Sequence, residues 1–255
     1  MHVAQIVALS LLLLGSAAGQ DPKTAEEILK RVKETLGKAE SITVVFEEDY
    51  SEKGGRRGDE KHTRTGKYWF TAENKMRIEY TAPAEKRPRD RFIREVVSNG
   101  ANVGYRRAPD GDFEMHFCPV NLYGAVRDAL PLAGFIEVQA GIMGMLNSAK
   151  AGRTPKDAPL DLLAKASYSK FELGEPERID GRDLAVIKFS VTRKGETEPE
   201  FNFRLWIDRK TWLPYKREEK YELADKKGSR IETYKSITLN GEIDPKLFQL
   251  PEAKK

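Results

Sequence analysis

The feature that most constrains this chain is the regular alternation of polar and apolar side chains in many short segments. The segment 75–80 reads Lys-Met-Arg-Ile-Glu-Tyr, and the segment 201–207 follows the same two-residue period. Alternate side chains of a strand lie on one face of its sheet, so each segment predicts a strand with one buried face. Turn-forming residues separate the segments, as at 98–100 and 109–111. Such short connections favour an antiparallel meander, because parallel strands need long crossovers.

The predicted strands extend over most of the chain. Besides the two segments above, strands are expected near 42–46, 65–72, 91–98, 102–107, 113–118, 167–174, 185–191, 214–223 and 230–240. An antiparallel sheet that bends strongly without closing leaves its concave side to be filled by side chains, by helices or by a ligand. The predicted fold class is therefore mainly β, of the α+β type, with a strongly curved antiparallel sheet.

One amphipathic helix precedes the first strand. Thr24 and Glu27 have the spacing of a capping box, and Gly37 supplies a stop. Five apolar residues recur at helical spacing between them: Ala25, Ile28, Leu29, Val32 and Leu36. Since only one face of this helix is apolar, we expect it to lie on the sheet.

The first 19 residues differ from the rest of the chain. They contain no Asp, Glu, Lys or Arg, and an apolar run over 6–14 is followed by small residues over 15–19. A bilayer-spanning helix needs about 20 apolar residues. The pattern therefore predicts a secretory signal over 1–19, with residues 20–255 forming one soluble, exported domain. A buried N-terminal helix or a membrane anchor is the alternative interpretation.

The pattern changes again between 119 and 166. Within it, residues 130–136 and 140–146 are apolar, lack the two-residue period, and contain several Gly and Met residues. Met side chains repack easily around irregular surfaces, and each Gly weakens a helix by about 1 kcal/mol relative to Ala. We predict a helical lid on the sheet, and an ordinary core helix is the alternative. The lid residues would be Leu132, Phe135, Ile136, Ile142, Met143, Met145 and Leu146.

The charge pattern argues against nucleic-acid binding. The 44 Lys and Arg residues are interspersed with 40 Asp and Glu residues, whereas a nucleic-acid site needs a concentrated basic face. Acidic clusters such as 47–49 are interpreted as solvated strand ends. An enzyme that uses carboxylates on the rim of the sheet is retained as an alternative.

No motif for catalysis or for metal binding is present in the sequence. The patterns GxSxG, HExxH, GxGxxG and the P-loop are all missing. His116 and Cys118 would share one face of a strand, but a metal site needs three or four ligands and a cysteine nucleophile needs an oriented base. They are interpreted as a half-buried histidine and a packed thiol. Since Cys118 is the only cysteine, it has no partner for an internal disulfide. We expect no catalytic residue, no metal and no cofactor.

Several motifs, taken in order, resemble the periplasmic lipoprotein carrier and outer-membrane lipoprotein-sorting family. They span nearly the whole chain after the signal. The motifs are the helix leading into Ser41-Ile42-Thr43-Val44-Val45-Phe46, then Gly66-Lys67-Tyr68-Trp69-Phe70, the segment 75–80, Val97-Ser98-Asn99-Gly100, the strand that ends at Leu213-Pro214, and the closing segment 240–251.

The resemblance implies an unclosed β-barrel with helices over its mouth and a cavity for acyl chains. It implies a periplasmic protein that binds lipid or lipoprotein and touches membranes only transiently, and we expect a monomer. The predicted cavity residues are Phe46, Trp69, Met76, Ile78, Tyr80, Phe203 and Leu205. Dedicated carriers have Arg-Pro where this chain has Ala72-Glu73, so the expected function is that of a carrier-like relative with an unidentified ligand. A protein-binding or stress-sensing module, and a structural envelope protein with a filled core, are the alternatives.

Overall fold

The computed structural model describes seven ranges of the chain: 21–54, 58–81, 95–106, 111–117, 166–193, 201–223 and 225–250. The predicted signal over 1–19, the seven predicted lid residues and Cys118 lie outside these ranges. Within the described part, the chain forms one α-helix, thirteen strands and a short 3-10 helix.

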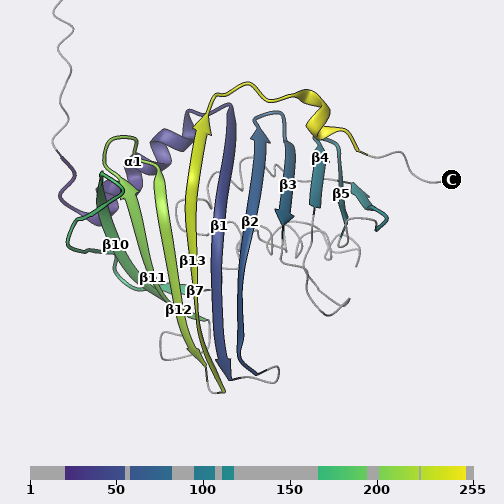
Figure 1. Cartoon of the computed structure of the whole chain (residues 1–255). Coiled ribbons are helices and arrows are strands. Elements are labelled where there is room, and N and C mark those ends of the chain that lie inside the picture. The colour runs from purple at the N-terminus through teal and green to yellow at the C-terminus, as the bar shows by residue number, and fades with distance from the viewer. Residues whose placement is uncertain are drawn as a thin grey trace, which may run out of the picture.

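The strands are long in the middle of the sheet and short at its sides (Figure 1). Their bounds are β1 Ser41–Gly54, β2 Glu60–Thr71, β3 Lys75–Thr81, β4 Glu95–Asn99, β5 Asn102–Arg106, β6 Glu114–Phe117, β7 Ala166–Tyr168, β8 Glu172–Leu173, β9 Glu177–Ile179, β10 Arg182–Arg193, β11 Phe201–Asp208, β12 Pro214–Leu223 and β13 Lys226–Leu239. The helix α1 is Ala25–Gly37, and the 3-10 helix η2 is Pro245–Phe248.

All thirteen strands belong to one antiparallel sheet. Its order is β6-β5-β4-β3-β2-β1-β13-β12-β11-β10-β7, and β8 and β9 also pair with β10. The first and last long strands, β1 and β13, lie side by side at the centre. Among the described strands, no pairing joins β6 to β7, so the sheet is not closed into a barrel. The predicted mainly β fold with an unclosed antiparallel sheet is confirmed.

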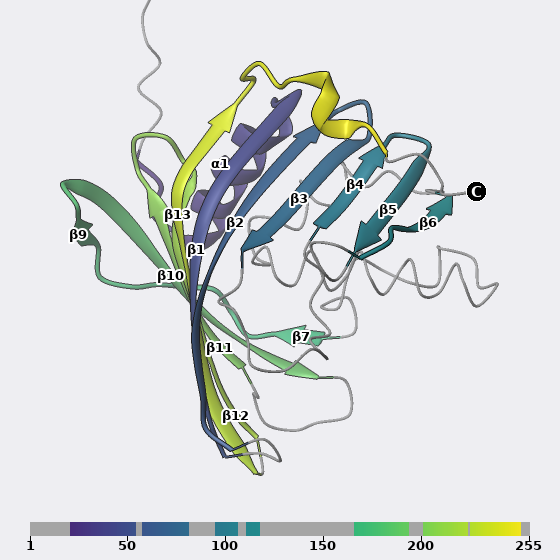
Figure 2. The ribbon, with the colours of Figure 1, turned by 45° about the vertical axis from the view of Figure 1, so that its right-hand side comes forward.

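The sheet bends around α1, and the face that α1 contacts is called the inner face (Figure 2). The predicted capping box is present, since Thr24 Oγ1 accepts from the N–H of Glu27 and Glu27 accepts from the N–H of Thr24. The five predicted apolar helix residues are all buried, and they join the inner-face residues of β1, β2, β3, β10 and β11 in one core. The predicted N-terminal helix on the sheet is therefore confirmed.

Several turns use residues that tolerate a left-handed backbone, although Trp212, between β11 and β12, also has a φ of 55°. Asn74, Asp180 and Asn240 take the left-handed backbone conformation that Asn and Asp tolerate. The predicted turn at 98–100 joins β4 to β5, and Gly100 has a φ of 98°. A Cβ at Gly100 would lie 2.9 Å from the carbonyl oxygen of Glu73, so both the backbone angle and the space call for glycine.

Candidate functional site

The inner face of the sheet changes from apolar to charged along the length of its strands. On β1 the inward residues are Ile42, Val44 and Phe46, followed by Glu48 and Glu52. Ile42, Val44, Phe46 and Glu48 are each 0% exposed. A buried carboxylate needs compensating partners, because the removal of a charge from water is costly.

The neighbouring strands bring charged residues to the level of Glu48. In the register of the sheet, Glu48 lies opposite Arg64 on β2 and opposite Glu232 on β13. On the far side of β13, Arg217 lies opposite Glu232 and Glu219 lies opposite Arg230. We call this group the charged belt; it consists of Glu48, Arg64, Arg217, Glu219, Arg230 and Glu232. All but Arg230 are buried, and Arg230 is 19% exposed.

Ion pairs connect five members of the charged belt, and the sixth, Glu232, accepts a hydrogen bond from Tyr234. Arg230 bridges two carboxylates, with Nε 3.0 Å from Oε1 of Glu48 and Nη1 3.2 Å from Oε2 of Glu219. Arg217 Nη1 lies 3.4 Å from the same Oε2 of Glu219, and Arg64 Nη1 lies 3.8 Å from Oε2 of Glu48. With three arginines and three glutamates, the formal charge of the belt sums to zero. The belt, with Glu232 counted in, therefore spans four strands with a formal charge of zero.

A layer of tyrosine hydroxyls separates the apolar part from the charged belt. The hydroxyls of Tyr68 and Tyr80 lie 2.5 Å apart, and Tyr234 donates to Oε2 of Glu232 at 3.0 Å. Burial raises the pKa of both Tyr68 and Tyr80 well above the ordinary value, and the nearby Glu232 and Glu48 raise it further. These hydroxyls therefore stay neutral and serve as hydrogen-bonding groups between apolar and ionic surroundings.

Six of the seven predicted cavity residues share the inner face. Phe46, Met76 and Ile78 are buried on β1 and β3, and Tyr80 packs against the same core. Phe203 and Leu205 are buried on β11, on the other side of the central strands. The register thus brings together residues more than a hundred positions apart in the sequence, although all six are packed against neighbours.

Trp69 does not share the face of the other six. It lies opposite Thr43 on β1 and Arg77 on β3, whereas its neighbours Tyr68 and Phe70 point to the inner face. Successive side chains of a strand alternate between faces, so Trp69 belongs to the outer face. Trp69 was predicted to line the same cavity as Phe46, and this prediction is corrected because the two side chains lie on different faces of the sheet.

The interpretation of 47–49 as a solvated strand end is wrong for Glu48. Asp49 is exposed and Glu47 is half-buried, but Glu48 continues the inward series of Ile42, Val44 and Phe46. Sequence reasoning missed the whole charged belt. The signal that could have found it is the two-residue period, which assigns Glu48 to the same face as Phe46 whatever its charge.

The charged belt and the predicted cavity residues are in contact. The guanidinium carbon of Arg217 lies 4.6 Å from the centre of the Phe203 ring, and Arg217 is opposite Leu205 in the register. A guanidinium over an aromatic face is a favourable cation–π contact, more so when it is desolvated. The inner face is thus a continuous surface with an apolar part and an ionic part.

Beyond the belt, towards the end of β1, a second polar group occupies the same face. Tyr50 donates to Glu52 at 2.9 Å, Tyr221 also donates to Glu52, and Lys226 Nζ lies 3.0 Å from its Oε2. Burial raises the pKa of Glu52, but the hydrogen bonds from Tyr221, Lys226 and Tyr50 outweigh it, so the pKa is lowered overall. Glu52 is therefore ionised and firmly held.

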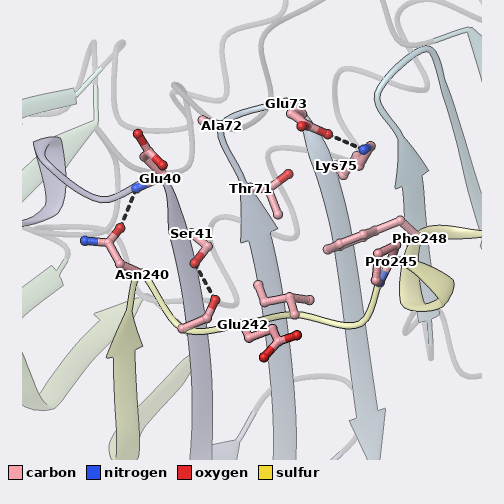
Figure 3. Close-up of a pocket in the computed structure, with 12 residues that line it drawn as sticks. Glu40, Ser41, Thr71, Ala72, Glu73, Lys75, Asn240, Glu242, Pro245 and Phe248 are labelled. Atoms are coloured by element: carbon pink, nitrogen blue, oxygen red, sulfur yellow. Dashed lines mark hydrogen bonds and ion pairs between the residues drawn. The ribbon is translucent and has the colours of Figure 1, made fainter.

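A cleft of about 620 Å³ lies at the other end of the central strands (Figure 3). It is bounded by the start of β1, the turn between β2 and β3, and the segment 240–248. The N–H of Glu40 donates to Asn240 at 2.7 Å, and Ser41 Oγ donates to the carbonyl of Gly241 at 2.9 Å. Ala72 and Glu73, the two residues compared with Arg-Pro in the sequence analysis, line this cleft.

Comparisons with known proteins give matches only among solved structures. No family model matches the chain, and no curated protein sequence matches it. A LolA-superfamily protein from Nitrosomonas europaea is 12% identical, with a TM-score of 0.31, over 90% of this chain and 99% of the other. The lipoprotein LppX from Mycobacterium tuberculosis is 10% identical, with a TM-score of 0.41, over 86% and 98%.

A third similar structure is the MucA/MucB complex of Pseudomonas aeruginosa, at 16% identity and a TM-score of 0.39. The match covers 88% of this chain and 60% of the other, so this chain spans less than two thirds of that protein. These identities and scores are too low to carry a function from one protein to another.

Within the described ranges, no three His, Cys, Asp or Glu side chains come together as metal ligands would. None of the helices in the described part is long and apolar enough to cross a membrane.

Proposed function

We propose that the protein is a non-catalytic carrier that binds the acyl chain of a lipid or lipoprotein on the inner face of its sheet. The observation that carries this proposal is the apolar part of the inner face, where Phe46, Ile78 and Leu205 line a bent and unclosed sheet. Burial of acyl methylenes gains about 0.8 kcal/mol per CH₂, so one long chain is enough for useful affinity.

The apolar side chains are covered in the structure, so the ligand has to replace part of that cover. The helix α1 supplies some of it, because its five apolar residues belong to the same core. The amphipathic helix keeps its polar face towards solvent, and Arg31 on it lies 4.8 Å from the centre of the Trp212 ring. We expect ligand binding to lower the hydrogen-exchange protection of the segment that it displaces.

We also propose that the protein is exported to the periplasm and loses residues 1–19 there. The support is the uncharged, apolar start of the chain followed by small residues. Intact mass measurement of the protein from its native envelope tests this point. A mass that starts at residue 19 or 20 would support export, and an intact Met1 would contradict it.

Native mass spectrometry of the full chain from its own envelope tests the carrier proposal. A bound mass in the lipid range that solvent extraction removes is the expected result. Phe203→Ala should weaken rebinding of the extracted lipid about tenfold, which corresponds to about 1.4 kcal/mol. Trp69→Ala is the matched control, since Trp69 is an aromatic residue on the opposite face. If the protein from the envelope carries no lipid and also binds none when lipid is added, the carrier proposal is wrong.

A second candidate function is the binding of a protein. Two large apolar side chains of the described part are exposed, Met115 at 40% and Leu173 at 41%, and they lie on β6 and β8 near the two sides of the sheet. Exposed edge strands are templates for pairing with an added strand. The same mass measurement separates the two functions, because a protein partner would add a mass far above that of a lipid.

A further inference from the structure

The charged belt is an unexpected part of a surface that binds acyl chains. An acyl chain needs no charge in its site, and burying ions is unfavourable unless partners compensate for the lost hydration. Yet the belt occupies the same face, and the same strands, as the apolar residues. The apolar Phe46 and the ionic Glu48 are two positions apart on β1, which is about 7 Å along a strand.

We propose that the charged belt holds the headgroup of an amphiphile whose acyl chain lies on the apolar part of the inner face. The proposal rests on the proposed carrier function and names its ligand class, a lipid with a zwitterionic headgroup. The spacing supports it, since a headgroup at Glu48 and Arg230 would directly follow a chain that packs on Phe46. The contact of Arg217 with the Phe203 ring marks the same boundary on the other side.

The charge balance of the belt selects a zwitterion rather than an anion. Three arginines and three glutamates sum to zero, and below them Glu52 and Lys226 add another balanced pair. An anionic headgroup would leave one uncompensated negative charge in a buried site. A headgroup with one phosphate and one ammonium exchanges ion pairs one for one, and the total charge stays at zero.

Arg230 is the member of the belt best placed to take the phosphate. It is the most exposed of the three arginines, at 19%, and it already bridges the carboxylates of Glu48 and Glu219. A guanidinium offers several donors in one plane, which fits a phosphate as well as it fits a carboxylate. The ammonium of the ligand would then pair with the carboxylate that Arg230 releases.

The outer face offers a matched control for Arg230. Arg77 is 21% exposed and also bridges two carboxylates, with Nε 2.6 Å from Glu79 and Nη2 2.5 Å from Glu95. Arg77 lies on the outer face, opposite Trp69 in the register and on the other side of the sheet from the six inner-face cavity residues. A change at Arg77 therefore removes a similar ion pair network without touching the inner face.

The test compares three lipids that share one acyl chain: lysophosphatidylethanolamine, lysophosphatidylglycerol and monoacylglycerol. Affinities for the full, delipidated chain are measured by calorimetry. The zwitterionic lipid should bind about tenfold more tightly than the other two. Arg230→Gln should remove this preference, whereas Arg77→Gln should leave it intact. Binding of all three lipids with equal affinity would overturn the headgroup site and leave the carrier proposal standing.

Two further outcomes are decided in the same experiment. Binding of none of the three lipids would overturn the carrier proposal, and the headgroup site with it. If Arg230→Gln fails to fold, Arg230→Lys replaces it, because lysine keeps the charge but loses the planar donor set. The preference for the zwitterion should then fall about threefold, and an unchanged preference would overturn the role of Arg230. A purely structural belt would change stability in these variants without changing the ratio of affinities.

Discussion

Arg230 and Arg77 occupy opposite faces of one sheet, and each holds two glutamates. Their exposures are nearly equal, 19% and 21%. The difference lies in their partners. Glu48 and Glu219 on the inner face are both buried, whereas on the outer face Glu95 is buried but Glu79 is 42% exposed. An ion pair with access to water can exchange its partner for solvent, and a buried one cannot.

The outer network also has an evident structural task. Arg77 Nη1 donates to the carbonyl oxygen of Leu247 at 3.2 Å, and Arg106 Nε lies 2.6 Å from Glu95. The first contact joins η2 to β3, and the second joins β4 to β5. The helix η2 lies against β3 and β4, where Figure 1 shows the C-terminal segment crossing the top of the sheet. Similar chemistry thus holds η2 on the outer face and lines the proposed binding surface on the inner face.

The largest expected effect concerns the two buried glutamates, Glu48 and Glu95. Glu48→Gln should lower the free energy of unfolding by about 3 kcal/mol or more, because Arg64 and Arg230 would keep their charges in a buried place. Glu95→Gln should cost about half as much, since Arg77 and Arg106 are partly exposed and can be solvated. Urea unfolding measures both values. Equal losses would mean that the inner belt is no more isolated from water than the outer network.

A smaller effect is expected for two glycines on opposite faces. A Cβ at Gly66 would overlap the Phe46 ring, which is stacked on Tyr68 at 5.2 Å and cannot turn away. Gly66→Ala should therefore cost about 2 kcal/mol, as overpacking in a close-packed core does. A Cβ at Gly104 would lie 2.7 Å from Sδ of Met115, 3.0 Å from the Phe113 ring and 3.2 Å from the Leu250 side chain. The closest of these contacts is with the flexible and exposed side chain of Met115, which can move.

Gly104→Ala should thus cost less than about 1 kcal/mol. Thermal and urea unfolding of the two variants give the comparison. A loss at Gly104 as large as that at Gly66 would show that the β6 side of the sheet is packed as rigidly as the inner face.

Local patterns in the sequence were enough to predict much of the fold. The capping box at Thr24 and Glu27, the alternation over 75–80 and the turn at 98–100 each depend on neighbouring residues, and all three are confirmed. The alternation also predicts on which face of the sheet each side chain lies. It places Trp69 and Tyr68 on different faces of the sheet, so the phase of Trp69, and not its aromatic character, decides that it lies outside the inner face.

The charged belt could not be predicted in the same way. It joins residues from β1, β2, β12 and β13, and Glu48 meets Glu232 only because the two ends of the chain pair at the centre of the sheet. Each charged residue by itself is typical of a solvent-exposed strand face. Only the register shows that six of them share one inner face and balance each other's charge.

The smallest effect in this comparison concerns the tyrosines of the two faces at high pH. Burial raises the pKa of Tyr68 and Tyr80 well above the ordinary value of 10.0, so folding favours their neutral hydroxyls. This stability is fully present below pH 10.0 and is lost as the pH rises through the folded pKa values. Tyr215 on the outer face also has a raised pKa, because it donates a hydrogen bond to Asp180, but it is partly exposed.

Tyrosinate absorbance during an alkaline titration should therefore rise in two phases. Tyr215 belongs to the first phase, which is reversible and leaves the circular dichroism unchanged. Tyr68 and Tyr80 belong to the second, which coincides with unfolding. Tyr80→Phe should remove one tyrosine from the second phase and, because Tyr68 loses a hydrogen-bond partner, should cost about 1 kcal/mol. If all tyrosines ionise before the protein unfolds, water reaches the layer of tyrosine hydroxyls. The inner face would then be as accessible to water as the outer face.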